Sequence, residues 1–210
     1  HRDLHSFPTR RSSDLAVKFI TPTGYTLTSA NVGADGSDSD AGVGGLSGCY
    51  NLESGETDNT VDAGLVPLAS LGDRVWEDSN GDGQQNNGES GIPDATVKLY
   101  TCVNNAPGVL VGETTTDAQG NYSFTNLQPG EYIVEFITPN GFERTTANVG
   151  ADASDSDAGT GGLSGCYELS PGENEDTVDA GFYKPAAIGD HVWSDLDGDG
   201  QQDAGEPGVA

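Results

Sequence analysis

Short segments in which apolar and polar residues alternate recur along the chain, and each predicts a β-strand. Six of them lie at residues 96–102, 110–116, 121–127, 131–138, 165–170 and 176–183. In the fourth segment Tyr132, Val134 and Phe136 occupy every second position. A period of two places such side chains on one face of a strand, so we expect them to pack in a core.

Turn-forming residues separate these segments. The stretches DAQGN at 117–121 and QPGE at 128–131 combine Gly, Pro, Asp and Asn, which favour tight turns. Short strands joined by turns are typical of a sandwich or barrel rather than of a helical protein. The pattern therefore predicts an all-β fold.

Two blocks of the sequence occur twice at one spacing. Residues 28–65 return at 145–182 and residues 71–85 return at 188–202, so both offsets are 117 positions (145 − 28 and 188 − 71). Repetition at a fixed period indicates tandem structural units. We expect the C-terminal part of a first repeat at 16–68, a complete repeat at 69–185, and the first strand and acidic loop of a third repeat at 186–210.

The first fifteen residues differ in composition from everything that follows. Residues 1–15 (HRDLHSFPTRRSSDL) hold three of the eight basic residues and two of the three histidines. They match, residue for residue, the translation of a DNA adapter common in short-read sequencing, so we interpret them as a translated library artefact and exclude them from the fold. A basic N-terminal arm is the alternative.

The charge of the chain limits the classes of partner that it is expected to bind. It carries 34 Asp and Glu residues against 8 Lys and Arg, a formal charge of −26. This excess disfavours nucleic acids and anionic membrane surfaces, which are polyanions, and favours cations. We expect no membrane insertion within this fragment, since no apolar run approaches the roughly 20 residues that span a bilayer.

Two acidic dodecamers predict which cation is bound. Residues 78–89 (DSNGDGQQNNGE) and 195–206 (DLDGDGQQDAGE) both match the calcium-loop template D-x-[DN]-x-[DN]-G-x5-E. The predicted ligands are Asp78, Asn80, Asp82, Gln84 and Glu89 in the first loop and Asp195, Asp197, Asp199, Gln201 and Glu206 in the second, with Asn86 and Asp203 acting through water. Ca²⁺ takes about six to eight oxygen ligands, and this spacing supplies them around a sharp glycine turn.

The surroundings of the dodecamers differ from those of a helix-loop-helix calcium-binding protein. The flanking sequences LGDRVW and SGIPDATVKLY resemble strands. The eighth position of the dodecamer is Gln85 or Gln202, where the loops of helix-loop-helix proteins usually have an apolar residue. We therefore expect a calcium loop set between strands, just after the first strand and close to the junction at the start of each repeat. The alternative is a solvated acidic turn that binds no ion.

A second acidic run occurs in both copies. Residues 150–159 (GADASDSDAG) repeat residues 33–42 (GADGSDSDAG). Two interpretations stay open: Asp152, Asp155 and Asp157 form another calcium site with a neighbouring loop, or the run is a hydrophilic surface loop.

The cysteines follow the repeat. Cys49 and Cys166 are the same repeat position, and the counterpart of Cys102 would precede the chain, because 102 − 117 is negative. Each whole repeat thus has two cysteines. We predict a Cys102–Cys166 disulfide, as is usual outside the cytoplasm, with two buried free thiols as the alternative.

The sequence offers no arrangement typical of an enzyme. After residue 15 the single histidine is His191, whose counterpart is Arg74. No nucleophile, base and orienting group occur together, and nothing singles out two carboxylates as a glycosidase pair. We predict a protein that is not an enzyme.

Several motifs in order resemble the calcium-binding B-type repeats of serine-aspartate-repeat adhesins, within the collagen-adhesin B-like group. They are TTTDAQGNYSFTNLQPGEYIVEF, DTVDAGFYKP and IGDHVWSDLDGDGQQDAGEPGV, and the resemblance covers essentially residues 16–210. It implies an immunoglobulin-like or transthyretin-like β-sandwich in tandem repeats, with Ca²⁺ in the loop after the first strand. The cysteine pair departs from the family pattern. Some relatives form an internal isopeptide bond from lysine, for which Lys98 is the candidate without an identifiable partner.

The resemblance also implies a function. Such repeats form the stalk of an adhesin on the bacterial cell surface or cell wall, with neighbouring repeats of the same chain as partners. One alternative is a module that binds a host protein or glycan through exposed aromatic residues, for which Trp76, Phe142 and Tyr167 are candidates. Another is an accessory domain of a secreted enzyme.

Overall fold

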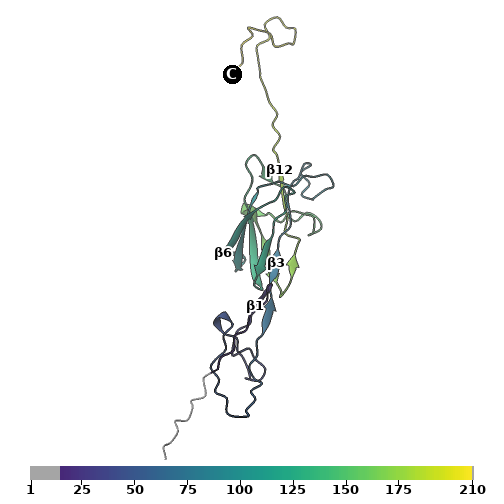
Figure 1. The fold of residues 1–210 in the computed structure, drawn as a ribbon. Helices are drawn as coiled ribbons and strands as arrows, with labels where there is room; N and C mark the ends of the chain where they lie inside the picture. Colours follow the sequence, from purple (N-terminus) through teal and green to yellow (C-terminus); the bar gives the residue numbers. More distant parts are fainter. Residues whose placement is uncertain (1–14, 210) are drawn as a thin grey trace, which may run out of the picture.

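The computed structural model describes residues 15–209, and the predicted adapter segment therefore lies outside the described residues except for Leu15. The chain forms an elongated molecule in which the three segments predicted above follow one another along one axis (Figure 1). We keep the predicted names for them: the first repeat (16–68), the complete repeat (69–185) and the third repeat (from 186). No α-helix occurs between residues 15 and 209, and nothing in this range has the length and apolar character of a membrane-crossing helix. The all-β prediction is confirmed.

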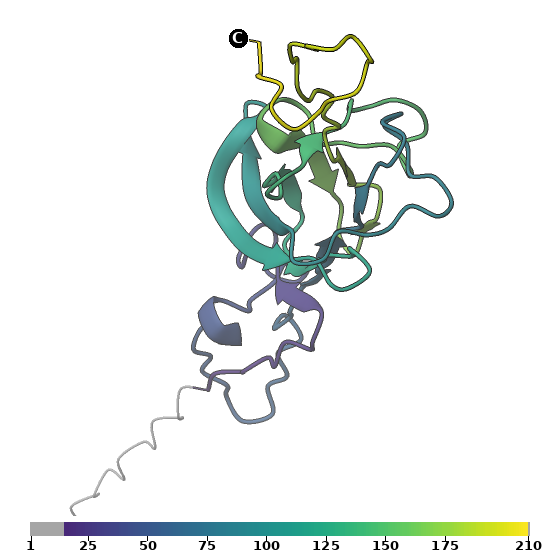
Figure 2. The same ribbon diagram turned by 90° about the horizontal axis from the view of Figure 1, so that it is seen from above.

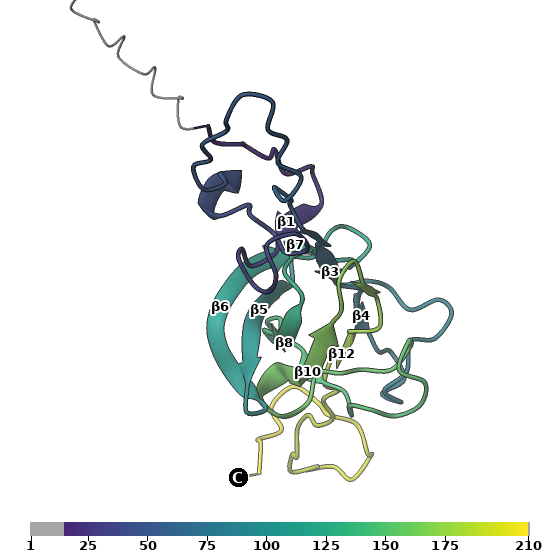
Figure 3. The same cartoon turned by 90° about the horizontal axis from the view of Figure 1, so that it is seen from below.

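The complete repeat contains one four-stranded and two three-stranded sheets. The first has the order β10-β8-β5-β6, and the others are β11-β3-β7 and β4-β12-β9. The strands are β3 (Ala69–Leu71), β4 (Val75–Glu77), β5 (Thr96–Val103), β6 (Ala106–Thr115), β7 (Phe124–Leu127), β8 (Gly130–Phe136), β9 (Glu143–Arg144), β10 (Leu163–Leu169), β11 (Asn174–Glu175) and β12 (Ala180–Tyr183). Viewed along the molecule, the four-stranded sheet curves around one side, and β3, β4 and β12 lie on the other (Figures 2 and 3).

Both layers contribute to one core. Tyr132, Val134 and Phe136 of β8 are at most 7% exposed, as the alternation in this segment predicted. Ile133, on the opposite face of the same strand, is also buried at 3%. The remaining core side chains include Leu71, Val75, Val97, Leu99, Tyr122, Phe124, Leu169, Val178 and Phe182.

The predicted strand boundaries agree with the structure best where side chains alternate most regularly. Strand β5 extends one residue beyond its predicted end, whereas β6 begins at Ala106, four residues before its predicted start. Strand β12 begins at Ala180, four residues later than predicted. The residues before it form hydrogen bonds to loops rather than to a strand, for example from the Asp179 N–H to the Asp157 carboxylate at 2.7 Å.

The first repeat keeps the pairing of the complete repeat. Strand β1 (Tyr25–Leu27) pairs antiparallel with β2 (Leu65–Pro67), and Leu27 faces Leu65. In the complete repeat β9 pairs with β12 in the same register, where Arg144 faces Phe182, exactly one period later. The short 3₁₀ turns η1 (Val43–Gly45) and η2 (Thr160–Gly162) are likewise 117 positions apart.

The third repeat has its loop but no sheet among residues 186–209. Ile188 is fully exposed, whereas its counterpart Leu71 is 0% exposed in the core. Leu71 is covered because β3 pairs with β7 and β11, and both partners occur later in the repeat. The counterparts of these partners fall beyond Ala210.

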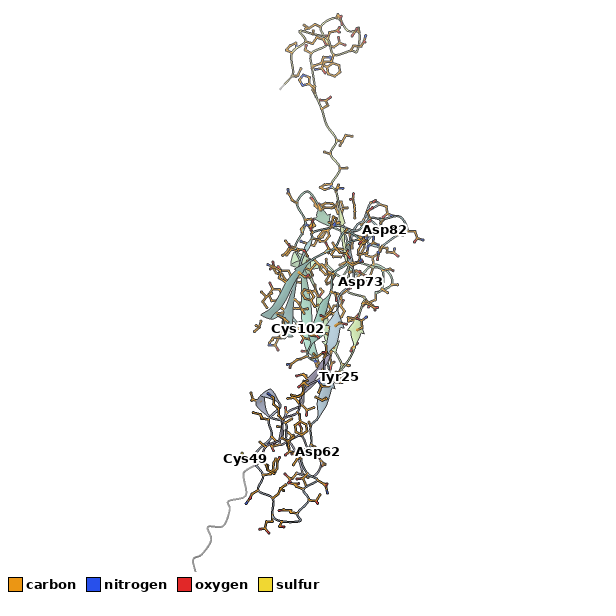
Figure 4. The ribbon with its side chains drawn as sticks, in the orientation of Figure 1. Tyr25, Cys49, Asp62, Asp73, Asp82 and Cys102 are labelled. Carbon is orange, nitrogen blue, oxygen red and sulfur yellow. A yellow bond between two sulfur atoms is a disulfide. The ribbon has the colours of Figure 1, made fainter. Side chains whose placement is uncertain are left out.

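The position of the first dodecamer corrects one expectation. Strand β4, which leads into it, runs parallel to β12, so that Val75 faces Ala180 and Glu77 faces Phe182. Both strands therefore end at the same edge, and Asp82 lies close to where the chain leaves for the third repeat (Figure 4). We expected the loop near the junction at the start of the repeat, and this was wrong: it lies near the junction at the end.

Candidate metal centre

Asp78 is the anchor of the first dodecamer. Its side chain is 0% exposed, and Oδ1 accepts the Gly81 N–H at 2.7 Å. Oδ2 accepts the Gly83 N–H at 2.8 Å and the hydroxyl of Thr145. These bonds draw the backbone of the loop around one carboxylate.

Side chains at the third, fifth and ninth positions of the dodecamer meet at Asp82. The Asp82 Oδ2 accepts the amide groups of Asn80 and Asn86, both at 2.9 Å. The Gln84 N–H donates to Oδ1 of the same carboxylate at 2.9 Å. The hydrogen bond from Asn86 is the main reason that the pKa of Asp82 lies below its ordinary value, so this carboxylate is charged at neutral pH.

Glu89 closes the loop from its twelfth position. Its Oε1 accepts the Ser79 N–H and its Oε2 accepts the Asn86 N–H, each at 2.8 Å. One carboxylate thus holds both ends of the dodecamer together.

The second dodecamer repeats this arrangement one period later. Asp195 accepts the N–H groups of Gly198 and Gly200, and Glu206 accepts those of Leu196 and Asp203. The carboxylates of Asp195, Asp197 and Asp199 lie within 4.8 Å of one another, although all three residues are exposed. These hydrogen bonds form although no sheet surrounds the loop among residues 186–209.

Gly83 fits its position for two reasons. Its φ of +80° lies in the left-handed region, which side chains with a Cβ disfavour. A Cβ at this position would also lie 2.6 Å from the Thr146 carbonyl oxygen. The sixth position of the loop therefore needs glycine both for the turn and for its contact with the loop after β9.

The second acidic run packs directly on the first dodecamer. Gln84 and Asp155 form an antiparallel bridge, and the Ser156 N–H donates to the Gly83 carbonyl at 3.2 Å. The two regions singled out separately in the sequence are therefore one structural unit.

This run contains a carboxylate oxygen without a partner. Oxygens of Asp152, Asp155 and Asp157 lie within 4.8 Å of one another. Asp155 is 3% exposed, and its Oδ1 accepts no hydrogen bond. Burial raises the pKa of Asp155, and it raises that of Asp157 to about 6. Buried carboxylates with an unpartnered oxygen match the ligands that a hard cation prefers, so the residues present fit Ca²⁺.

Asp157 is also held from outside the cluster. The Tyr167 hydroxyl donates to its Oδ1 at 2.8 Å, and Asp179 donates its N–H to Oδ2. The first repeat copies this contact, since Tyr50 donates to Asp40 at 3.0 Å. Tyr167 therefore positions a carboxylate, and the sequence signal that could have revealed this is the repetition of both residues at 117 positions.

The structure also contains an acidic pair that the sequence analysis missed. Asp179 is 0% exposed; its Oδ1 accepts the Arg74 N–H at 3.1 Å, and its Oδ2 has no hydrogen-bond partner. Burial and the neighbouring Asp73 carboxylate raise the pKa of Asp179 to about 8, and burial also raises that of Asp73. A proton shared between the two carboxyl groups supplies the missing donor.

Cys102 and Cys166 are joined in a disulfide, with their Cα atoms 5.9 Å apart. Cys102 lies at the end of β5 and Cys166 on β10, two strands separated by β8 in the sheet. Cys49, the counterpart of Cys166 in the first repeat, is exposed and free.

The aromatic residues and the lysine singled out in the sequence lie in the core, against it or within a strand. Trp76 is 0% exposed, so the expectation that it contributes to an exposed aromatic patch is wrong. Phe142 and Tyr167 are half-buried against the core. Lys98 lies opposite Glu113 and Glu135 on the neighbouring strands rather than opposite Asn or Asp.

Comparison with known proteins identifies the relatives of this chain. The SdrD B-like domain family matches residues 4–65 and 69–182. Serine-aspartate repeat-containing protein F of Staphylococcus epidermidis is 40% identical over 214 residues, covering 98% of this chain and 12% of that protein. Serine-aspartate repeat-containing protein E of Staphylococcus aureus is 42% identical over 197 residues, covering 92% of this chain and 16% of the relative. The chain thus spans less than a fifth of the length of these curated relatives.

Solved structures resemble this chain only weakly. The Bacillus anthracis TIE protein has a TM-score of 0.39 at 19% identity, covering 80% of this chain and 24% of its own. GBS52, the minor pilin of Streptococcus agalactiae, has a TM-score of 0.39 at 12% identity, covering 80% and 85%. TM-scores this low do not establish a shared fold. The all-β fold is established by the strands and core of this chain.

Proposed function

This chain belongs to the SdrD B-like domain family, and from that premise we propose that its complete repeat is a calcium-stabilised spacer in the stalk of a bacterial surface adhesin. Two acidic segments, residues 78–89 and 150–159, pack on one another where the chain passes to the next repeat. This contact carries the proposal, because an ion at this place stabilises both the fold of one repeat and its connection to the next.

The first dodecamer would hold one ion through Asp78, Asn80, Asp82, Glu89 and the main-chain carbonyl of Gln84. Asp195, Asp197, Asp199, Glu206 and the carbonyl of Gln201 would do the same in the third repeat. Bound Ca²⁺ supplies positive charge that balances several carboxylates gathered in one small loop. Hydrogen bonds that recur in both loops support this assignment, since Asp78 and Glu89 accept the same backbone N–H groups in the first loop as Asp195 and Glu206 accept in the second.

A second ion would be held by Asp152, Asp155 and Asp157. The unpartnered Oδ1 of Asp155 supports this proposal, because an oxygen buried without a donor is costly unless a cation or a proton neutralises it. The position of this cluster against the first dodecamer means that both ions would stabilise the same end of the repeat.

The connection between repeats suits a spacer. Strand β2 of the first repeat ends at Pro67 and β3 of the next begins at Ala69, so that Leu68 alone separates them. A connection this short leaves little freedom for the repeats to reorient, and the elongated arrangement in Figure 1 is consistent with it. The repeats would extend a separate functional region away from the cell, with neighbouring repeats as their partners and no enzymatic role.

Calcium-dependent unfolding of the whole chain tests this function. We expect the unfolding temperature in excess Ca²⁺ to exceed that in excess chelator, because an ion bound only to the folded state adds stability. Glu89→Gln should lose a large part of this difference, whereas Glu113→Gln on the exposed strand β6 serves as a matched control. Equal unfolding temperatures with and without Ca²⁺, together with no heat of calcium binding in calorimetry, would refute the proposal.

A further inference from the structure

A short turn of the complete repeat contacts the first repeat. In this turn the Glu173 N–H donates to the Ser170 carbonyl at 3.1 Å, and Gly172 faces Pro67 of the first repeat. A Cβ on Gly172 would lie 3.2 Å from the Pro67 Cβ, so the absence of a side chain keeps the contact close. The Ser70 N–H also donates to the Glu173 carbonyl at 2.9 Å, which fixes the turn to the first strand of its own repeat.

The turn contacts Pro67 of the first repeat, and we call Pro67 together with its neighbours Gly24 and Tyr25 the receiving surface. Pro67 is opposite Tyr25 in the β1–β2 pair. The Leu68 N–H donates to the Gly24 carbonyl at 2.8 Å, and this bond holds the connecting residue against the surface. Tyr25 lies at this junction (Figure 4).

The complete repeat has a corresponding surface at its far end. One period later, Gly24, Tyr25 and Pro67 become Gly141, Phe142 and Lys184. The Lys184 Nζ lies 5.0 Å from the centre of the Phe142 ring and 2.7 Å from the Glu77 carboxylate. Next to them is a hollow of about 330 Å³, lined by residues 77–81 at the start of the dodecamer and by Tyr183, Lys184 and Ala186.

We propose that the surface formed by Phe142 and Lys184 is the docking site for the turn of a following repeat that corresponds to Ser170–Glu173. The third repeat begins at Ala186, and its copy of this turn would fall 117 positions after Ser170, beyond Ala210. The inference rests on the proposed spacer function, since it requires repeats in series. Its occupant is known by analogy, because the same turn already occupies the equivalent surface of the first repeat.

The chemistry of the turn suits Lys184. In the complete repeat the Glu173 carboxylate accepts the Ser170 N–H at 2.6 Å. In the first repeat Glu56 accepts the Glu53 N–H at the same distance, and Gly55 precedes it as Gly172 precedes Glu173. Both copies of the turn therefore carry a glycine that permits close approach and a carboxylate that complements the lysine charge.

The two junctions differ at the residue that connects one repeat to the next. The counterpart of Leu68 is Pro185, which has no N–H to donate to the Gly141 carbonyl. Proline instead fixes its own φ near −65°. The ion pair from Lys184 to Glu77 adds a link to the residue that immediately precedes the calcium ligand Asp78, so that docking and ion binding share one end of the repeat.

A chain with a completed third repeat tests the proposal. Ala210 corresponds to Pro93 (210 − 117 = 93), so appending a copy of residues 94–185 after Ala210 completes the repeat. Amide hydrogen exchange is followed in excess Ca²⁺ at residues 139–145 and 182–186, in the 210-residue chain and in the extended chain. We expect exchange there to slow by about tenfold in the extended chain, and Lys184→Glu to remove that protection. Equal exchange in the two chains would overturn the docking site.

A second arm uses the 210-residue chain and its existing junction. The variant Tyr25→Phe, Pro67→Lys and Leu68→Pro gives the first receiving surface the residues of the second. We expect exchange at residues 169–174 to remain as slow as in the unchanged chain, while Pro67→Glu accelerates it by repulsion from Glu173. If the triple variant accelerates amide exchange at residues 169–174 as much as Pro67→Glu does, the surface with lysine and proline cannot receive the turn. The calcium dependence of unfolding in the 210-residue chain tests the spacer function separately, because that chain lacks the proposed occupant.

Discussion

The Gln85 N–H donates to the Ser154 carbonyl at 2.7 Å, which joins the first acidic dodecamer to an acidic run about 70 residues later in the chain. This bond and the neighbouring bridge between Gln84 and Asp155 make the two acidic segments a single unit. The unit lies at the end of the repeat because β4 and β12 run in the same direction.

Gly83→Ala should destabilise the loop more than Gly81→Ala. Both glycines have positive φ, +80° and +74°, so both substitutions strain the backbone. Only at Gly83 would the new Cβ meet another atom, the Thr146 carbonyl oxygen, whereas Gly81 has open space around it. We expect a loss of about 1 kcal/mol at Gly81 and a larger loss at Gly83. Chemical denaturation in excess Ca²⁺ measures both, and equal losses would contradict the close contact.

Thr145→Val should weaken the anchor of the dodecamer. The Thr145 hydroxyl donates to Asp78, whose side chain is completely buried. Valine keeps the shape but removes the donor, which costs about 1–3 kcal/mol where the acceptor is buried. Calcium affinity is measured by calorimetry and stability by thermal unfolding. The exposed neighbour Thr146 provides the matched control Thr146→Val, and equal effects at the two positions would argue against this role for Thr145.

Removing the disulfide should destabilise the complete repeat by about 2–4 kcal/mol, the usual range for a closed loop of this kind. The bridge joins positions 64 residues apart in sequence. The double variant Cys102→Ser and Cys166→Ser is compared with the oxidised chain by urea unfolding. Cys49→Ser is the control, since Cys49 is exposed and free. A double variant as stable as the control would mean that the sheet gains nothing from the bridge.

The calcium-free chain should become less stable as the pH rises from about 4 to about 8. Burial and Asp73 raise the pKa of Asp179 to about 8, so the folded state keeps a proton that the unfolded chain, with an ordinary aspartate pKa near 3.8, has released. The folded state thus binds more protons within this window, and stability falls as the pH rises through it. Asp157, whose pKa is about 6, adds to the same trend.

Asp179→Asn should reduce this pH dependence and raise the unfolding temperature at pH 8. Asparagine carries no charge, and its amide group supplies a donor toward Asp73 without a shared proton. Thermal unfolding in chelator at several pH values measures the slope in both chains. Identical slopes would show that Asp179 does not titrate with a raised pKa.

The sequence by itself determined the strands with regular alternation, the 117-residue period and the conformation of the dodecamers. Strand β8 and its core residues follow from a local pattern of period two. The hydrogen bonds that both dodecamers share form although Asp78 is buried and Asp195 is exposed, because these shared bonds join residues within twelve positions of one another. Interactions over so short a distance need no surrounding repeat.

The tertiary structure alone decided which distant segments meet. The parallel pairing of β4 with β12 joins residues about 100 positions apart, and it moved the loop from the expected start of the repeat to its end. The carboxyl pair of Asp73 and Asp179 and the contact of Gly172 with Pro67 depend on the same long-range packing. Alternation and turn signals specify which face of a strand is buried, but not which strand becomes its neighbour, since neighbours are selected by the packing of the whole core.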